Sequence, residues 1–394
     1  MKILQEKKDI FYNIQIILFF ILMYQLIKKS QSSKDIILIG SLMLVTIIKN
    51  YKEKIYLKLD KKIFFLTITY LVYIILNYII LSSHYKNIVA YKMLESLIKS
   101  LVLFFLMTQI KFKRNTKNII FPMVLLGTLN PIIKGLIIIK ETGIFKERIG
   151  LWENPNYYSM VLGIFIIISL FSLFKYKSYF IKILSLFIFG ASFFIIICLT
   201  QSKTTFLSII IILFIFSCDY LKEKYIKLKI VTALIFIFLM FYLWQKNARI
   251  LTTFRLEHIL NDGRIILWKI GLETFIIEKK YIFGVGIGYF TNHLIKFRSS
   301  ELGALHNDFI EILVPQGIVG VVLYYSFLLS LLFKLYKNIS ENEFSKIGTY
   351  CIFYLILIGM SDVTNISLRI PQLILIICGL GINISLNNES VNLE

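Results

Sequence analysis

Residues 157–174 read YYSMVLGIFIIISLFSLF and contain 18 residues in succession without a charged side chain. A helix needs about 20 predominantly apolar residues to cross the hydrocarbon core of a bilayer. Hydrophobic residues make up 57% of the chain, and its mean hydropathy is +0.76, which is far above the values typical of a soluble domain. The sequence therefore predicts an all-α polytopic membrane protein.

Eleven further apolar runs match the same template, so we expect about twelve spanning helices. The runs at 35–48 and 205–220 are short for a span. No tandem repeat and no Pro- or Ser-rich linker divides the chain, so residues 1–394 are expected to form a single membrane domain. With 157–174, the expected spans are 10–27, 35–48, 63–82, 94–110, 119–139, 179–199, 205–220, 228–245, 312–334, 347–361 and 368–386.

The formal net charge of +21 comes from Lys and Arg in short clusters between the apolar runs. Such clusters are topology signals and contacts to anionic lipid, so no nucleic-acid partner is expected. Their bias favours both termini in the cytoplasm and residues 246–311 as a large extracytoplasmic loop with short helices. The group Lys28, Lys29 and Lys34 opposes this orientation because it falls in an outer loop.

The polar stretch 246–311 carries three of the four histidines, and its second part contains two features of chemical interest. Residues 261–278 predict an amphipathic helix capped by Asn261 or Asp262, with Arg264 in its first turn. There the guanidinium can bind a phosphate or diphosphate at the helix N-terminus, or it can simply snorkel to lipid headgroups. The expected apolar face consists of Ile265, Trp268, Leu272 and Phe275.

His306 begins the second feature, at the start of the next membrane helix, with Asn307, Asp308 and Glu311 beside it. A helix N-terminus favours a neutral imidazole, and nearby carboxylates can orient it, as a general base requires. An interfacial histidine without a chemical role is the simpler alternative. A metal site is not expected, because His258 and His293 lack ligand spacing and all four cysteines lie in apolar runs.

Three smaller elements complete the predicted outer face. Asn154-Pro155-Asn156 predicts a turn fixed by side-chain hydrogen bonds. Lys203, in a tight connection, is either a topology residue or a second cation that faces Arg264. The run Gly284-Val-Gly286-Ile-Gly288 is not a dinucleotide fingerprint, and it predicts a turn of closely approaching backbone or, less directly, N–H groups that hold a phosphate.

Taken in order, these motifs resemble the superfamily of O-antigen ligases and O-antigen or capsule polymerases. The resemblance implies a twelve-helix fold of the C-type glycosyltransferase kind. It also implies metal-independent, inverting glycan transfer from an undecaprenyl-diphosphate-linked donor on the outer face of the cytoplasmic membrane, with no cofactor. The matching elements are Gly150…Asn154-Pro155-Asn156, Leu199-Thr200-x-Ser202-Lys203, Asp262-Gly263-Arg264…Trp268, Gly284-x-Gly286 and His306-Asn307 before Gly317-x-x-Gly320.

The resemblance also assigns roles to single residues. His306 is expected to take the proton of the acceptor hydroxyl, and Arg264 to bind the lipid diphosphate. Lys203 stands where the family usually has an arginine, so it keeps the charge but loses the bidentate fork. The supporting residues are Asn307, Asp308, Glu311, Asn154, Asn156 and Trp268.

Several functions remain open at this point. The Ile/Lys/Asn-rich composition fits an AT-rich organism with either type of cell envelope, and only a Gram-negative envelope offers lipid A–core as an acceptor. A polymerase that joins lipid-linked repeat units is therefore favoured over a ligase that moves a finished glycan to lipid A–core. A lipid-linked oligosaccharide flippase and a non-catalytic scaffold are the alternatives of another class. Intramembrane charge is sparse, which disfavours a transporter. The expected partners are the lipid-linked donor, a glycan or lipid-linked acceptor, the bilayer and proteins of a polysaccharide export pathway.

Overall fold

A computed structural model describes residues 2–28, 33–52, 60–81, 88–110, 112, 114–144, 148–151, 154–220, 263–287, 305–340, 342–364 and 369–391. Throughout these ranges the regular elements are helices and no strand occurs, which confirms the all-α class. The helices are α1 (Lys2–Lys28), α2 (Ser33–Lys52), α3 (Lys61–Leu81), α4 (Ile88–Gln109), α5 (Arg114–Thr142), α6 (Pro155–Lys175), α7 (Tyr179–Ile195), the π-helix η2 (Ile196–Thr200), α8 (Lys203–Tyr220), α12 (Gly263–Glu278), α14 (Asp308–Lys337), α15 (Glu343–Gly359) and α16 (Ile370–Val391).

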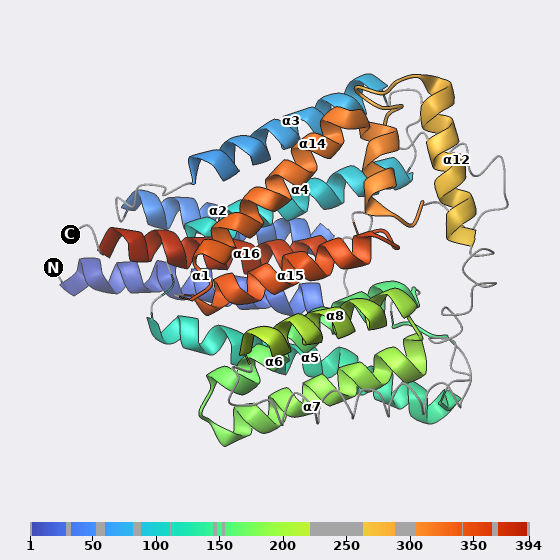
Figure 1. The fold of residues 1–394 in the computed structure, drawn as a ribbon. Coiled ribbons are helices and arrows are strands. Elements are labelled where there is room, and N and C mark those ends of the chain that lie inside the picture. Colours follow the sequence, from blue (N-terminus) through green and yellow to red (C-terminus); the bar gives the residue numbers. More distant parts are fainter. Residues whose placement is uncertain are drawn as a thin grey trace.

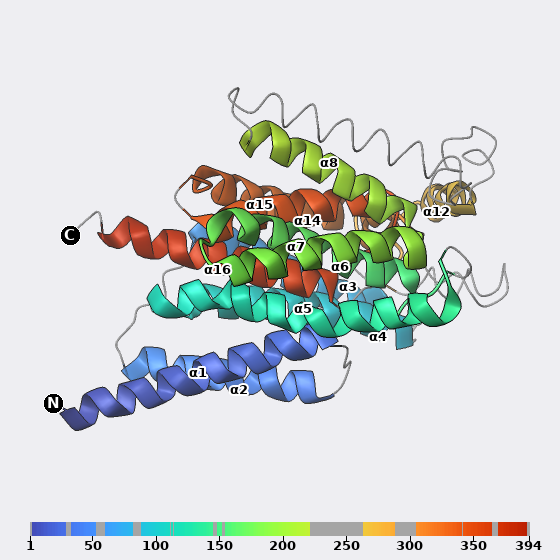
Figure 2. The same ribbon diagram turned by 90° about the horizontal axis from the view of Figure 1, so that it is seen from below.

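The long helices lie side by side in a bundle, and α12 crosses one end of it (Figure 1). The start of α1 and the end of α16 lie at the opposite end, and the view from below shows the same arrangement (Figure 2). Eleven of the expected runs overlap these helices, and 228–245 lies outside the described residues. Six segments are long and apolar enough to cross a membrane, namely 10–27, 61–81, 118–142, 155–175, 179–200 and 308–337.

Helix α6, which contains the opening run, is the most buried of these six segments. Small residues on it let neighbouring helices approach closely, as they do in membrane bundles generally. A Cβ at Gly163 would overlap the ring of Tyr354 from α15, whose hydroxyl donates to the carbonyl of Met160 at 2.9 Å. Helix α6 therefore packs in the core against both α7 and α15.

Helix α14 is broken near its start. Gly317 has φ 65° and ψ −170°, a conformation that only glycine adopts readily, and Pro315 precedes it by two residues. The helix begins at Asp308, seven residues before Pro315. Residues 308–316 therefore form a separate short arm that carries its own N-cap.

The segment 281–287 fills this break by pairing its backbone with that of α14. Val285 N–H donates to Val314 O at 3.0 Å and Gly286 N–H to Pro315 O at 2.9 Å, while Ile318 N–H donates back to Tyr281 O at 2.9 Å. The Asn77 side chain of α3 adds bonds to the carbonyls of Phe283 and Pro315. The backbone groups freed by the break are thus satisfied inside the protein, as a membrane environment requires.

Candidate active site at the end of the bundle

His306 lies directly before α14, one residue ahead of the N-cap Asn307, and has a left-handed φ of 52°. Asn307 Oδ1 accepts from Ile310 N–H at 3.1 Å, and its Nδ2 donates to Met360 O at 2.8 Å. This cap ties the start of α14 to the segment after α15. The His306 ring is consequently held at the end of the bundle, with 22% of its side chain exposed.

Two of the predicted supporting residues fix the backbone around His306. Glu311 Oε2 accepts from Leu305 N–H at 2.7 Å, and the Trp268 indole donates to His306 O at 3.4 Å. Neither side chain contacts the imidazole in these bonds. The carboxylate that orients the ring was expected to come from Asp308 or Glu311, and this expectation is wrong.

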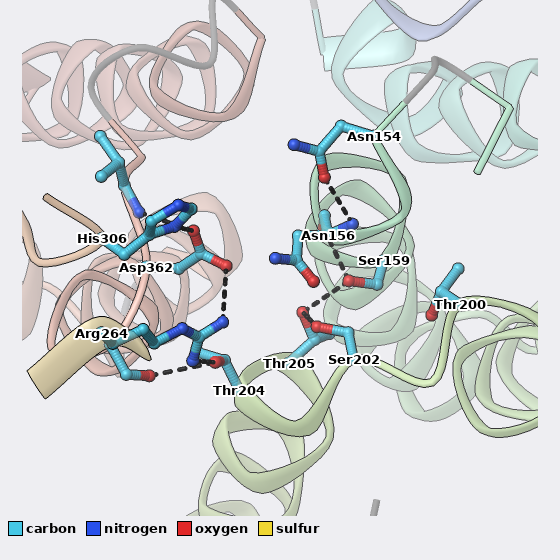
Figure 3. Close-up of polar contacts among 12 residues, drawn as sticks. Asn154, Asn156, Ser159, Thr200, Ser202, Thr204, Thr205, Arg264, His306 and Asp362 are labelled. Carbon is cyan, nitrogen blue, oxygen red and sulfur yellow. Dashed lines mark hydrogen bonds and ion pairs between the residues drawn. The ribbon is translucent and has the colours of Figure 1, made fainter. Parts of the chain in front are cut away.

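The orienting carboxylate is Asp362, in the segment between α15 and α16. Its Oδ1 lies 3.0 Å from His306 Nδ1 and accepts from Val363 N–H at 2.9 Å, and the side chain is only 1% exposed (Figure 3). A carboxylate can only accept, so the proton of the neutral imidazole sits on Nδ1. The ring nitrogen Nε2 then carries the lone pair that a general base needs.

Asp308 holds the segment that supplies Asp362. Its Oδ1 accepts from Thr364 N–H at 2.8 Å, and its Oδ2 accepts from the Thr364 hydroxyl. A Cβ on Gly359 would come within 2.5 Å of Asp308 Oδ2, so glycine is needed for this close approach. Asp308 is therefore a support of the site through Thr364 rather than through the imidazole.

Arg264 occupies the first turn of α12, as predicted, and points toward Asp362 (Figure 3). Its NH2 lies 3.6 Å from Asp362 Oδ2, and its NH1 donates to Thr204 Oγ1 at 3.2 Å. The side chain is 26% exposed, so Asp362 is buried between an imidazole and a guanidinium that both reach solvent. This group of His306, Asp362, Arg264 and Thr204 is called the His–Asp–Arg group below.

The inward face of α12 differs in part from the predicted one. Leu267 and Trp268 pack with Leu305, Ile310 and Val314 at the start of α14. Of the predicted apolar face, Trp268 and Phe275 pack against this cluster, whereas Ile265 and Leu272 are 38% and 40% exposed. Arg264 shares the helical face of Leu267 and Trp268, because these positions follow it at three and four residues. The predicted caps Asn261 and Asp262 lie outside the described residues.

Lys203 begins α8, one residue before Thr204, which places it at the same end of the bundle as Arg264. The connection into α8 follows the π-helix η2, and Gln201 leaves that π-helix with a left-handed φ of 49°. Short π-helices are frequent next to functional sites. This backbone arrangement presents Ser202, Lys203 and Thr204 in succession at the helix N-terminus.

A second polar network faces the His–Asp–Arg group from α6 and α8 (Figure 3). Asn154 caps α6 by accepting from Asn156 N–H at 2.9 Å, as predicted, and Asn156 Oδ1 accepts from Arg148. The Ser159 hydroxyl lies 2.8 Å from that of Thr205. The bond between Arg148 and Asn156 ties the turn before α6 to that helix, and the bond between Ser159 and Thr205 joins α6 to α8.

The glycine run belongs to the α14 break rather than to an anion site. The N–H of Gly284 donates to Lys280 O at 2.8 Å, and that of Gly286 donates to Pro315 O at 2.9 Å. Their positive φ values of 77° and 103° explain why glycine is needed there. The phosphate-holding interpretation is wrong for these two residues, and Gly288 lies outside the described part of the chain.

The sequence analysis missed three site residues, namely Asp362, Thr204 and Ser361, whose hydroxyl donates to Thr204 Oγ1. Asp362 is the one acidic residue between the expected spans 347–361 and 368–386, which is a usable signal. Thr204 follows Lys203 and carries no charge to attract attention. Within the described ranges, no group of three or more His, Cys, Asp or Glu side chains could hold a metal ion.

Comparison with known families gives one match. Residues 186–325, a little over a third of the chain, match the family model described as O-antigen ligase. This stretch includes Lys203, Arg264 and His306, and it ends before Asp362. No curated protein matches the chain.

The family match confirms the resemblance to the O-antigen ligase and polymerase superfamily. It supports a multi-pass membrane enzyme of the glycosyltransferase kind, consistent with lipid-linked glycan substrates.

Proposed function

We propose that the chain transfers glycan from an undecaprenyl-diphosphate-linked donor on the outer face of the cytoplasmic membrane, and that it polymerises O-antigen or capsule repeat units. The observation that carries the proposal is the position of Asp362 between His306 and Arg264. His306 and Arg264 both lie next to the buried Asp362 carboxylate. They are therefore close enough for one to act as a base and the other as a cation on the two sides of the transferred glycan.

In this mechanism His306 Nε2 accepts the proton of the acceptor hydroxyl as the oxygen attacks the anomeric carbon. A glycosidic bond forms, and the bond between that carbon and the diphosphate oxygen breaks. The leaving lipid diphosphate gains charge, which the Arg264 guanidinium and the Lys203 ammonium stabilise without a metal ion. A single displacement of this kind inverts the configuration at the anomeric carbon.

Asp362 is proposed to keep the imidazole in the productive tautomer and to stabilise the imidazolium that forms, as carboxylates do in catalytic triads. Its Oδ1 is 3.0 Å from His306 Nδ1, and its Oδ2 lies toward Arg264. Asp362 is therefore a positioning residue for the base.

We also propose a single membrane domain of twelve spanning helices with cytoplasmic termini. The start of α1 and the end of α16 lie at one end of the bundle, and α12, whose first turn carries Arg264, crosses the other (Figure 1). An even number of spans is consistent with this separation. The external loop 246–311 would then present both Arg264 and His306 at the outer face.

A ligase is the second candidate, because the family model that matches is described as O-antigen ligase. The two activities share the base and the cations and differ in the acceptor. Purified protein given one undecaprenyl-diphosphate-linked repeat species should produce a ladder of longer lipid-linked products if it is a polymerase. The same ladder is expected in EDTA, because Arg264 and Lys203 supply the positive charge.

Other products would change the assignment. A substrate that stays unextended until lipid A–core is added indicates a ligase. Movement of the intact lipid-linked substrate across a bilayer, without transfer, indicates a transporter and contradicts both glycosyltransferase assignments.

A further inference from the structure

Thr204 lies where three parts of the site meet. It is the second residue of α8, and 7% of it is exposed. Its Oγ1 accepts from Arg264 NH1 of α12 at 3.2 Å and from the Ser361 hydroxyl at 3.1 Å. Because Ser361 directly precedes Asp362, one hydroxyl oxygen connects α8, α12 and the segment that carries the carboxylate.

Two of the contacts that Arg264 makes differ in kind. The distance of 3.2 Å from NH1 to Thr204 is that of a hydrogen bond, whereas 3.6 Å from NH2 to Asp362 Oδ2 is an ion pair beyond hydrogen-bond length. Asp362 is buried and charged, so it attracts the guanidinium strongly. The contact with Thr204 therefore restrains Arg264 at a distance from the carboxylate.

This restraint has consequences for both halves of the proposed reaction. If Arg264 moved onto Asp362 in a bidentate pair, it would compete with His306 for the carboxylate and turn its N–H groups away from a bound diphosphate. We infer that Thr204 is a positioning residue that keeps Arg264 directed at the donor diphosphate. The inference rests on the proposed function and extends it to a residue that does not itself contact the reacting atoms.

Thr205 provides an internal control for this inference. It is fully buried, and its hydroxyl lies 2.8 Å from that of Ser159 and accepts from Ser202 at 3.2 Å. Those bonds join α6 to α8 and lead away from Arg264 (Figure 3). Replacing either threonine by valine removes one hydroxyl at nearly constant volume, so the pair separates positioning of Arg264 from general packing.

The test measures the affinity for undecaprenyl diphosphate and the donor KM and kcat of purified full-length protein. Thr204→Val is expected to weaken undecaprenyl diphosphate binding and raise the donor KM by about 5- to 10-fold, a change within the range for one lost hydrogen bond. Thr204→Ser, which keeps the hydroxyl, should restore both values. Thr205→Val should leave the affinity unchanged and lower the thermal midpoint.

A double-mutant cycle tests whether Thr204 affects undecaprenyl diphosphate binding through Arg264. In an Arg264→Ala background, Thr204→Val should cause no further loss of undecaprenyl diphosphate affinity, because the residue that it positions is absent. An equal loss in both backgrounds, or a failure of Thr204→Ser to restore binding, would overturn the inference. If Thr204→Val folds poorly, Thr204→Ala gives the same comparison, because it also removes the hydroxyl and has no β-branched side chain.

The failure of this inference can be told apart from failure of the proposed function. If the wild-type protein transfers glycan, His306→Ala does not, and Thr204→Val behaves like the wild type, then only the role of Thr204 is wrong. If the wild-type protein neither transfers glycan nor binds undecaprenyl diphosphate, both assignments are wrong.

Discussion

The His–Asp–Arg group and the α14 break are both polar interruptions of an apolar bundle, but they use their polar atoms differently. In the His–Asp–Arg group, side chains from α8, α12 and the segments flanking α14 and α15 contact one another, and two of them reach solvent. In the α14 break, backbone N–H groups of 281–287 and 318–319 pair with backbone carbonyls. The His–Asp–Arg group leaves charged side chains available to a ligand. The pairing at the α14 break satisfies the backbone hydrogen-bonding groups that the break exposes.

This difference shows how polar motifs of a membrane protein are best interpreted. Glycine runs and broken helices attract functional hypotheses, yet their donors must first be checked against the backbone acceptors nearby. Gly286, for example, donates to Pro315, so it has no N–H left for a phosphate. Arg264 and His306 are instead held by side-chain contacts that a substrate can rearrange.

The largest expected effect is that of His306→Ala, which removes the proposed base from the His–Asp–Arg group. Loss of a general base typically reduces the rate by about 10²–10⁴-fold. The variant should keep its helicity, because the bonds that hold the backbone here come from Asn307, Glu311 and Trp268 rather than from the imidazole. Transfer would be measured as polymer yield from lipid-linked donor. A folded variant with wild-type yield would place His306 outside the chemistry.

Asp362→Asn should have the next largest effect, a loss of roughly 10²-fold in kcat, because an amide can stabilise the wrong imidazole tautomer. The donor KM should change by a smaller factor than kcat, because the bond to Thr204 still holds the Arg264 side chain that is proposed to bind the donor. Steady-state kinetics that separate kcat from KM provide the check. An unchanged kcat with a raised donor KM would mean that Asp362 serves Arg264 rather than His306.

A smaller effect on transfer is expected when arginine and lysine replace each other, because the charge is kept and only the shape of the side chain changes. Arg264→Lys should reduce transfer by about 10- to 100-fold, because the planar fork and its charge-assisted hydrogen bonds are lost. Lys203→Arg should be tolerated, since it restores the side chain that the superfamily usually has at this position. The two variants are assayed side by side. An Arg264→Lys variant with full activity would identify Arg264 as an interfacial anchor.

Much of the helical arrangement could be predicted because apolar runs in a membrane protein have few other conformations. Runs such as 157–174 have neither the charge nor the breaks that would stop a helix, and α6 begins at Pro155, directly after the Asn154 cap. The break at Gly317 was not predicted. It depends on pairing with 281–287, a segment about 30 residues earlier, and such pairing is invisible in local periodicity.

Part of the site could be predicted for a similar reason. His306 and Arg264 are unusual residues at predicted helix N-termini, and their positions were correct. The carboxylate was assigned to near neighbours because proximity in sequence was the only guide. Asp362 reaches His306 from 56 positions away through the packing of α14 with α15, and only the assembled bundle reveals this contact.

The last prediction concerns the α14 break and should affect stability more than catalysis. Gly317→Ala places a Cβ within 2.3 Å of Ile282 O at a φ of 65°, so we expect it to lower the free energy of unfolding by at least about 2 kcal/mol. Gly190→Ala is the matched control, because nothing lies within 4 Å of a Cβ there and alanine favours the helix. Thermal midpoints in detergent compare the two variants. If Gly317→Ala kept its midpoint but lost transfer like His306→Ala, the break would belong to the catalytic region, and the contrast between the two polar regions would not hold.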